Sequence, residues 1–180
     1  MSLFPPLDAN PDEVRALLAP LRNDFAIALH AADNAFAVGA IIRVAHSYLA
    51  REIIIVGDAP YYEKASMGME KYETIVRVAD DEAFLAHVGA RPLWAVEKDH
   101  ATTSIHAVGS FPKDVVLLFG SERFGVPDRL VKRADTVVGI PIYGVNHSLP
   151  LAVAAGIVMN EWARRRYASG TVVGMTIGGV

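Results

Sequence analysis

Three polar side chains occupy places where a reaction could be carried out. Glu122 lies in a loop between two glycines, directly after the apolar run VVLLF. Ser148 belongs to the polar turn Asn146-His147-Ser148 that opens the last long helix, and Arg43 lies on a helix that follows the apolar run FAIALHA. In an open sheet of parallel strands, ligands bind in the crevice at the carboxyl ends of the strands. These three residues are therefore candidates for one site.

Each candidate also has a plain structural interpretation. An arginine at position 43 can grip a phosphate or carboxylate with its forked guanidinium, although most helix arginines are simply solvated. Glu122 can hold a cationic or hydrogen-bonding group near a ligand, or it can cap the short helix that follows. Ser148 can serve a polar ligand at the exposed N–H groups of a helix start, or it can be an ordinary first-turn residue.

Several familiar site types are absent from the sequence. No Gly-rich loop ends in Gly-Lys-Ser/Thr, and no G-x-G-x-x-G follows the first apolar run, which argues against P-loop and classical dinucleotide sites. The chain has no cysteine, so thiolate chemistry and disulfides are excluded. The six histidines show no i,i+4 pairing with a carboxylate, so no metal site is predicted. The G-x-S-x-G motif that would support a Ser-His-Asp triad is also absent.

The elements that must position these residues alternate between strand and helix patterns. Strands are expected at FAIALHAA, REIIIVGD, TIVRVA, PLWAVEK, VVLLFG and TVVGIPI; helices are expected at 12–22, 33–50, 80–90, 126–134 and from Pro150 to Arg166. Such alternation predicts an α/β fold with a mostly parallel sheet and helices on both faces. The glycine-rich residues 168–180 suggest a tail, or an edge strand supplied to a partner.

Composition sets the remaining limits. A chain of 180 residues with 52% hydrophobic and 21% charged residues is consistent with one globular domain. The net charge of -3 indicates no overall electrostatic attraction to nucleic acid, although a local basic face is compatible with this charge. The apolar run LPLAVAAGIVM is too short for a membrane span of roughly 20 residues. The first residues lack a signal-peptide pattern, and a cytoplasmic protein is expected.

Three stretches together resemble the SpoU (TrmH-like) branch of the SPOUT RNA methyltransferases. They are NAFAVGAIIR (34–43), LLFGSERFGVP (117–127) and IPIYGVNHSLPLAVAAGIVMNEWAR (140–164), in the order and at the spacing of that family. The resemblance implies a sheet with a carboxyl-terminal trefoil knot that binds S-adenosylmethionine. It also implies a homodimer that uses residues of both subunits to methylate a ribose 2'-hydroxyl of tRNA or rRNA. The implied domains are a helical extension (1–24), a methyltransferase domain (25–167) and a tail (168–180).

The resemblance also assigns residues. Arg43, Glu122 and Ser148 match the family's catalytic positions, and Arg43 is expected to grip the RNA phosphate and polarise the 2'-hydroxyl. The cofactor is expected to lie against seven residues, largely through backbone groups: Leu118, Phe119, Gly120, Ile140, Ile142, Ser148 and Leu149. Candidates for RNA contact are Arg22, Arg43, Arg123, Arg129, Lys132 and Arg133.

Two positions depart from the family pattern. Ala37 stands where the family usually has asparagine, and Pro150 stands where its third motif usually continues with asparagine; Asn34 and Asn146 lie near enough in sequence to compensate. The departures favour an alternative, a catalytically impaired knotted RNA-binding protein of the same fold. A third hypothesis is a small-molecule-binding α/β domain without an RNA role, which the acidic net charge supports.

Overall fold

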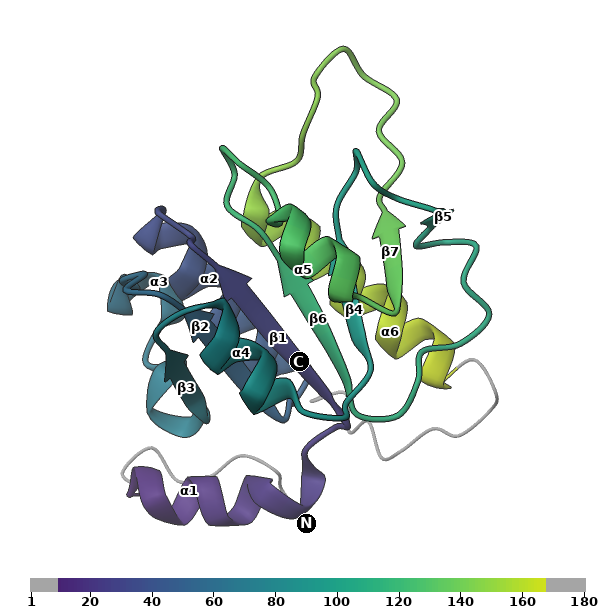
Figure 1. Ribbon diagram of the computed structural model, residues 1–180. Helices are drawn as coiled ribbons and strands as arrows, with labels where there is room; N and C mark the ends of the chain where they lie inside the picture. The colour runs from purple at the N-terminus through teal and green to yellow at the C-terminus, as the bar shows by residue number, and fades with distance from the viewer. Residues whose placement is uncertain (1–9, 168–180) are drawn as a thin grey trace.

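The computed structural model describes residues 10–167, and its described part contains a single parallel sheet (Figure 1). The strand order is β3-β2-β1-β6-β4-β7-β5, and every paired strand is parallel to its neighbour. The strands are β1 (Phe25–His30), β2 (Glu52–Val56), β3 (Ile75–Val78), β4 (Leu93–Val96), β5 (Thr103–Ser104), β6 (Val115–Phe119) and β7 (Thr136–Gly139). The helices are α1 (Pro11–Leu18), α2 (Ala35–Ser47), α3 (Glu63–Ser66), α4 (Asp81–Val88), α5 (Asp128–Arg133) and α6 (Leu151–Tyr167), with short 3-10 turns at Ala19–Leu21 and Met69–Tyr72.

Helices cover both faces of the sheet because the central strands are apolar on both sides. Alternate residues of each strand point to opposite faces. Thus Leu117 and Phe119 of β6 join the core under α2 and α6, whereas Val116 and Leu118 join the core under α4 and α5. In Figure 1, α4 and α5 lie in front of the sheet and α2 and α6 lie behind it. The predicted α/β architecture is confirmed.

Side-chain caps fix where the helices begin. The side-chain oxygen of Asn34 accepts hydrogen bonds from the N–H groups of Phe36 and Ala37, at 3.1 and 3.2 Å, and so starts α2. Asn10 caps α1 through the N–H of Asp12 at 2.9 Å. Asn34 lies near enough in sequence to compensate for the missing asparagine, and in the structure its side-chain oxygen serves this cap.

The sequence predicted the central strands and most of the helices, and it missed some boundaries. β7 was expected to reach Ile142, but it ends at Gly139. Pro141 has no N–H to donate to a ladder, which is the physical reason for the early end. The two-residue strand β5 was not predicted; it pairs with Val138 and Gly139 of β7. The last helix begins at Leu151, one residue after the expected Pro150.

No helix within residues 10–167 is long and apolar enough to cross a membrane. The expected roles of residues 168–180 lie outside the described residues. The trefoil knot stays a prediction from the family resemblance, because strand order and pairing do not by themselves fix the threading of the chain.

Arg22 was expected to face RNA, and this expectation is wrong. Its guanidinium is largely buried, donates to the carbonyl oxygens of Ala50 and Tyr72 at 2.9 and 2.6 Å, and pairs with the buried carboxylate of Glu73. His46 lies 2.7 Å from the other oxygen of that carboxylate. Removing one partner from such a group leaves a charge unpaired in the interior, so Arg22 is a structural residue.

A second buried carboxylate fixes the end of α6. Glu161 accepts hydrogen bonds from Arg164 at 2.6 Å and from Arg165 at 2.8 Å. The hydrogen bond from Arg164 is the largest cause that lowers the pKa of Glu161 to about 2, and Arg165 adds to it. Folding therefore favours the ionised form of Glu161 over the protonated form.

We predict that Gly39→Ala destabilises the protein although alanine is the better helix former. Gly39 lies where α2 meets the turn before α3, and an added Cβ would overlap the carbonyl oxygen of Tyr62. Overpacking of this kind costs about 1–3 kcal/mol. Thermal unfolding followed by circular dichroism should show a melting temperature lower by roughly 2–4 °C per kcal/mol. The control is Gly109→Ala, where an added Cβ meets nothing within 4 Å, and it should melt like the parent.

We predict a pH-dependent effect for Glu161→Gln. A carboxylate with a lowered pKa stabilises the folded state above its unfolded pKa, near 4.5, and that contribution is lost as the pH falls through about 2. Urea unfolding should therefore give a full difference of about 1–3 kcal/mol between parent and variant near neutral pH. The difference should shrink below about pH 4.5. A difference that stays constant on acidification would contradict the assignment.

Candidate active site

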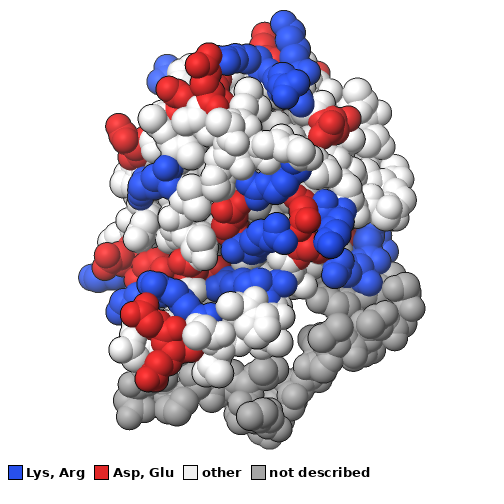
Figure 2. Space-filling view, turned by 60° about the horizontal axis from the view of Figure 1, so that its bottom comes forward, with Lys and Arg blue, Asp and Glu red and all other residues white. Residues whose placement is uncertain are grey.

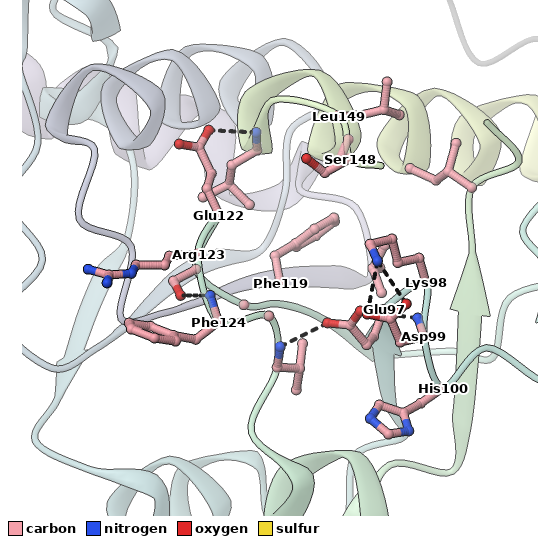
Figure 3. Close-up of a pocket in the computed structure, with 18 of the residues that line it drawn as sticks. Glu97, Lys98, Asp99, His100, Phe119, Glu122, Arg123, Phe124, Ser148 and Leu149 are labelled. Carbon is pink, nitrogen blue, oxygen red and sulfur yellow. Dashed lines mark hydrogen bonds and ion pairs between the residues drawn. The ribbon is translucent and has the colours of Figure 1, made fainter. Parts of the chain in front are cut away.

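A cavity of about 320 Å³ opens at the carboxyl ends of β4, β6 and β7, beside the start of α6 (Figure 3). Its position agrees with the predicted ligand crevice of an open α/β sheet. The volume falls within the range of about 300–1,000 Å³ found for small-molecule sites. The walls come from segments 96–100, 119–128, 140–142 and 148–154. Segments far apart in the sequence thus meet at one site.

The loop at residues 120–126 is the most tightly held of these segments. Gly120 cannot carry a side chain, because an added Cβ would overlap the backbone of Gly125. The N–H of Gly125 donates to the carbonyl oxygen of Ser121 at 2.9 Å, and the N–H of Phe124 donates to the Ser121 hydroxyl at 3.0 Å. Gly125 has a φ of +68°, which suits glycine. The loop is a closed turn whose shape is set by the backbone.

Glu122 caps a helix, but a different one from the helix expected. Its Oε1 accepts a hydrogen bond from the N–H of Leu151 at 3.0 Å, so it caps α6 from 29 residues away in the sequence rather than the adjacent α5. Figure 3 shows this contact across the top of the cavity. A carboxylate is favoured at the positive end of a helix dipole. Glu122 therefore ties the loop after β6 to the segment that carries Ser148.

Glu97 is a residue of the site that no sequence motif indicated. It follows β4 and lines the cavity, and its Oε2 accepts a hydrogen bond from the N–H of Val126 at 3.0 Å. Its Oε1 accepts a weaker bond from the N–H of Asp99 at 3.3 Å. The carboxylate lies so close to Gly125 that an added Cβ there would overlap it. No sequence signal separated Glu97 from an ordinary residue at the end of a strand.

Acidic side chains outnumber basic ones around the cavity. Glu97, Asp99, Glu122 and Asp128 line it together with Lys98 and Arg123. The ammonium of Lys98 binds the Asp99 carboxylate at 2.7 Å, and this hydrogen bond is the main reason that the pKa of Asp99 is lowered. His100 lies 3.6 Å from Asp128. The excess of carboxylates favours a ligand with positive charge.

The lining of the cavity also contains apolar side chains and most of the predicted cofactor residues. Phe119, Gly120, Ile140, Ile142, Ser148 and Leu149 all line the cavity. Leu118 does not: its side chain points to the other face of the sheet and is buried under α4 and α5. The period of two along a strand explains the difference between Leu118 and Phe119.

The segment from 140 to 149 offers backbone groups to a ligand. Within the described chain, residues 140–149 make no hydrogen bond to another backbone group. The side chain of Asn146 donates to the carbonyl oxygen of Ser148 at 3.0 Å and shapes the turn before α6. Asn146 thus supports Ser148 locally, as its position in the sequence suggested. Backbone N–H and C=O groups seek partners, so this segment is suited to polar recognition beside an apolar wall.

Arg43 does not lie at the cavity. It is exposed on the second half of α2, about 12 Å along the helix axis from Ala35 at 1.5 Å per residue. Within residues 10–167 its guanidinium has no hydrogen bond or ion pair. The structure therefore brings Glu122 and Ser148 to one cavity and leaves Arg43 outside it.

Comparison with known proteins places this fold and site in one family. Residues 24–160 match the model of the SpoU rRNA methylase family, so the chain belongs to that family. The 23S rRNA (guanosine-2'-O-)-methyltransferase RlmB of Coxiella burnetii is 28% identical over 140 residues, which are 73% of this chain and 54% of RlmB. The chain spans little more than half the length of the curated relatives that match most of it.

Solved structures agree with the family. An S-adenosylmethionine-bound rRNA methyltransferase from Sinorhizobium meliloti superposes with a TM-score of 0.73 at 31% identity, covering 83% of this chain and 60% of that one. The TrmH/SpoU tRNA-modifying enzyme of A. aeolicus has a TM-score of 0.77 at 24% identity, covering 89% and 84%. The second likeness concerns the fold alone.

We predict that Glu122→Ala loosens the start of α6. Loss of a side-chain cap costs about 0.5–2 kcal/mol, because the Leu151 N–H loses its partner. The melting temperature should fall by roughly 2–4 °C for each kcal/mol lost. Hydrogen exchange should accelerate at the amides of residues 151–153 and remain unchanged in α4. Glu13→Ala, at an exposed glutamate of α1, is the matched control and should shift stability by less than about 0.5 kcal/mol.

Proposed function

We propose that this protein transfers a methyl group from S-adenosylmethionine to a ribose 2'-hydroxyl of tRNA or rRNA. One observation carries the proposal: Glu122, Ser148 and all predicted cofactor residues except Leu118 line a single cavity at the carboxyl end of the sheet. The family to which the chain belongs supports the reaction class. Two curated relatives are named as guanosine 2'-O-methyltransferases, one of 23S rRNA and one, matching a third of this chain, of tRNA, which supports RNA as the substrate.

The residues present fit S-adenosylmethionine. The apolar wall of Phe119, Ile140 and Ile142 suits an adenine ring, and the free backbone groups of 140–149 can read its polar edge. The carboxylates of Glu97, Asp99 and Glu122 favour the positive sulfonium. A cationic ligand and an acidic rim are therefore complementary.

When bound, S-adenosylmethionine supplies an activated methyl group that the ribose oxygen can attack in line. The chain must align that oxygen and assist the loss of its proton, which the adjacent RNA phosphate would share. Ser148 is held at the cavity by Asn146, and Glu122 fixes the helix start beside it. Arg43 is a poor base because a guanidinium stays protonated, so we assign it to the RNA phosphate and to polarising the hydroxyl.

We further propose that the working unit is a homodimer. Arg43 lies outside the cavity of its own protomer, so a partner subunit must bring its arginine to the site if Arg43 is to act there. A face of α6 formed by Val153, Gly156, Ile157 and Asn160 is only partly covered in the protomer, and Val153 is 47% exposed. This partly exposed face, with Val153 and Ile157 beside Gly156, supports the packing of a second copy.

RNA binding must rely on individual exposed basic side chains, because the net charge of the chain is -3. Figure 2 shows one face of the molecule on which lysine and arginine side chains are interleaved with aspartate and glutamate. Arg129 is likewise paired with Glu82 at 3.1 Å. Arg43, Arg123, Lys132 and Arg133 remain as the exposed candidates. We propose that residues 25–167 form the methyltransferase domain and that residues 1–24 form an extension. We also propose a cytoplasmic location, because tRNA and rRNA are found there.

The proposal is tested by calorimetric titration with S-adenosylmethionine, followed by transfer of labelled methyl groups to unmodified tRNA and rRNA. Saturable micromolar binding and alkali-stable labelling of a nucleotide are the expected results, because a 2'-O-methyl group blocks hydrolysis at that position. Absence of cofactor binding by the folded protein would overturn the proposal. Cofactor-independent RNA retention without transfer would instead support the non-catalytic RNA-binding alternative raised by Ala37 and Pro150.

We predict that Arg43→Ala abolishes transfer and leaves S-adenosylmethionine affinity within about twofold, because Arg43 lies outside the cavity. Loss of one charged contact made in the transition state commonly costs about 100-fold or more. Arg15→Ala, at another exposed helix arginine, is the control and should keep full activity. A large loss of cofactor binding in Arg43→Ala would contradict the assigned role.

A further inference from the structure

An exposed aromatic side chain lies at the mouth of the cavity. Phe124 lines the cavity and is nevertheless 76% exposed. Burying a phenylalanine side chain is worth about 1.5–3 kcal/mol, and this ring forgoes most of that gain. Isolated apolar residues on a surface are common, so exposure alone identifies no site. The neighbours of Phe124 supply the further observations.

A cation lies over the ring. The guanidinium carbon of Arg123 is 5.0 Å from the centroid of the Phe124 ring, within the range of a cation–π contact. In Figure 3 the two side chains extend from the same loop, away from the wall that carries Ser148 and Leu149. Neither is needed to close the turn, since Ser121, Gly125 and Glu97 hold its backbone.

The loop presents the pair in a fixed position. The N–H of Phe124 is bound to the Ser121 hydroxyl, and the N–H of Val126 is bound to Glu97. Ser121 is itself buried. Because this backbone is already fixed, binding a ligand costs little further conformational entropy of the loop.

This arrangement matches a chemistry used by RNA-binding proteins. Unstacked bases of single-stranded RNA are held on the faces of aromatic rings and of arginine guanidinium planes. Stacking tolerates any base, whereas the guanidinium adds attraction to the polyanion. A flat, half-apolar ligand with negative charge nearby fits both members of the pair. The acidic residues around the cavity disfavour a ligand that binds by negative charge alone. The face of the Phe124 ring must therefore supply part of the attraction, by stacking on the base.

We propose that Arg123 and Phe124 form a stacking platform for a nucleobase of single-stranded RNA at the cavity mouth. This inference rests on the proposed function, because it names how the RNA is held beside the methyl-transfer site. The platform binds the base at the target nucleotide or its direct neighbour, and the ribose is thereby held near Glu122 and Ser148.

The test uses the full chain and a short single-stranded oligoribonucleotide with an internal 2-aminopurine, whose fluorescence is quenched by stacking. Titration with the parent protein should quench the probe. Phe124→Ala should weaken binding by about 5- to 150-fold and remove the quenching, by the usual effect of alanine at a base-stacking aromatic. Phe124→Tyr should retain both, since it keeps the ring. Lack of quenching by the parent would overturn the platform.

Three controls keep the outcome clear. Phe36→Ala removes another exposed ring, 62% exposed at the start of α2, and should leave RNA binding unchanged. Phe124→Ala should melt like the parent, because the ring is not part of a core. Its titration with S-adenosylmethionine should also match the parent; a loss there with intact RNA binding would assign the ring to the cofactor and overturn the platform. If the parent quenches the RNA probe but binds no S-adenosylmethionine, the proposed function fails and the platform stands.

Discussion

Two carboxylates joined to backbone N–H groups hold the candidate site together. Glu122 binds the start of α6, and Glu97 binds the end of the loop that carries Glu122. Three segments that follow β4, β6 and β7 are thereby joined at the carboxyl edge of the sheet. The sheet fixes where each segment begins, but these two hydrogen bonds set the distances between them. Hydrogen bonds with an ionised partner are about twice as strong as neutral ones, which suits them to this role.

The sequence predicted the features that depend on local pattern. Short apolar runs such as 53–56 and 115–119, rich in β-branched residues and followed by glycine, indicated buried strands. The glycines of the 120–126 loop indicated a close turn. Features that depend on tertiary contacts were not accessible. Arg22 looked like a surface cation because its partner, Glu73, is 51 residues away. β5 has two residues and carries no periodicity, and Glu97 had no motif around it.

The three candidate catalytic residues divide into two groups by their supporting structure. Glu122 is placed by its contact with the start of α6, and Ser148 by a hydrogen bond within its own turn. Arg43 is placed by a regular helix on one face of the sheet. The two departures from the family pattern lie at the starts of these same helices. Ala37 is buried in the first turns of α2, and Pro150 directly precedes α6, where its fixed φ is compatible with a helix start. The fold therefore accommodates both alanine at position 37 and proline at position 150.

In the closed turn at residues 120–126, the residues that shape the backbone differ from those whose side chains are exposed. Gly120, Ser121 and Gly125 are constrained by the backbone, while Arg123 and Phe124 extend from it and touch no core. Substitution at these two positions changes the mouth of the cavity, while the backbone of the turn keeps its hydrogen bonds to Ser121 and Glu97. A lineage can therefore change how firmly the mouth of the cavity holds a ligand through two adjacent codons, while the fold is inherited unchanged.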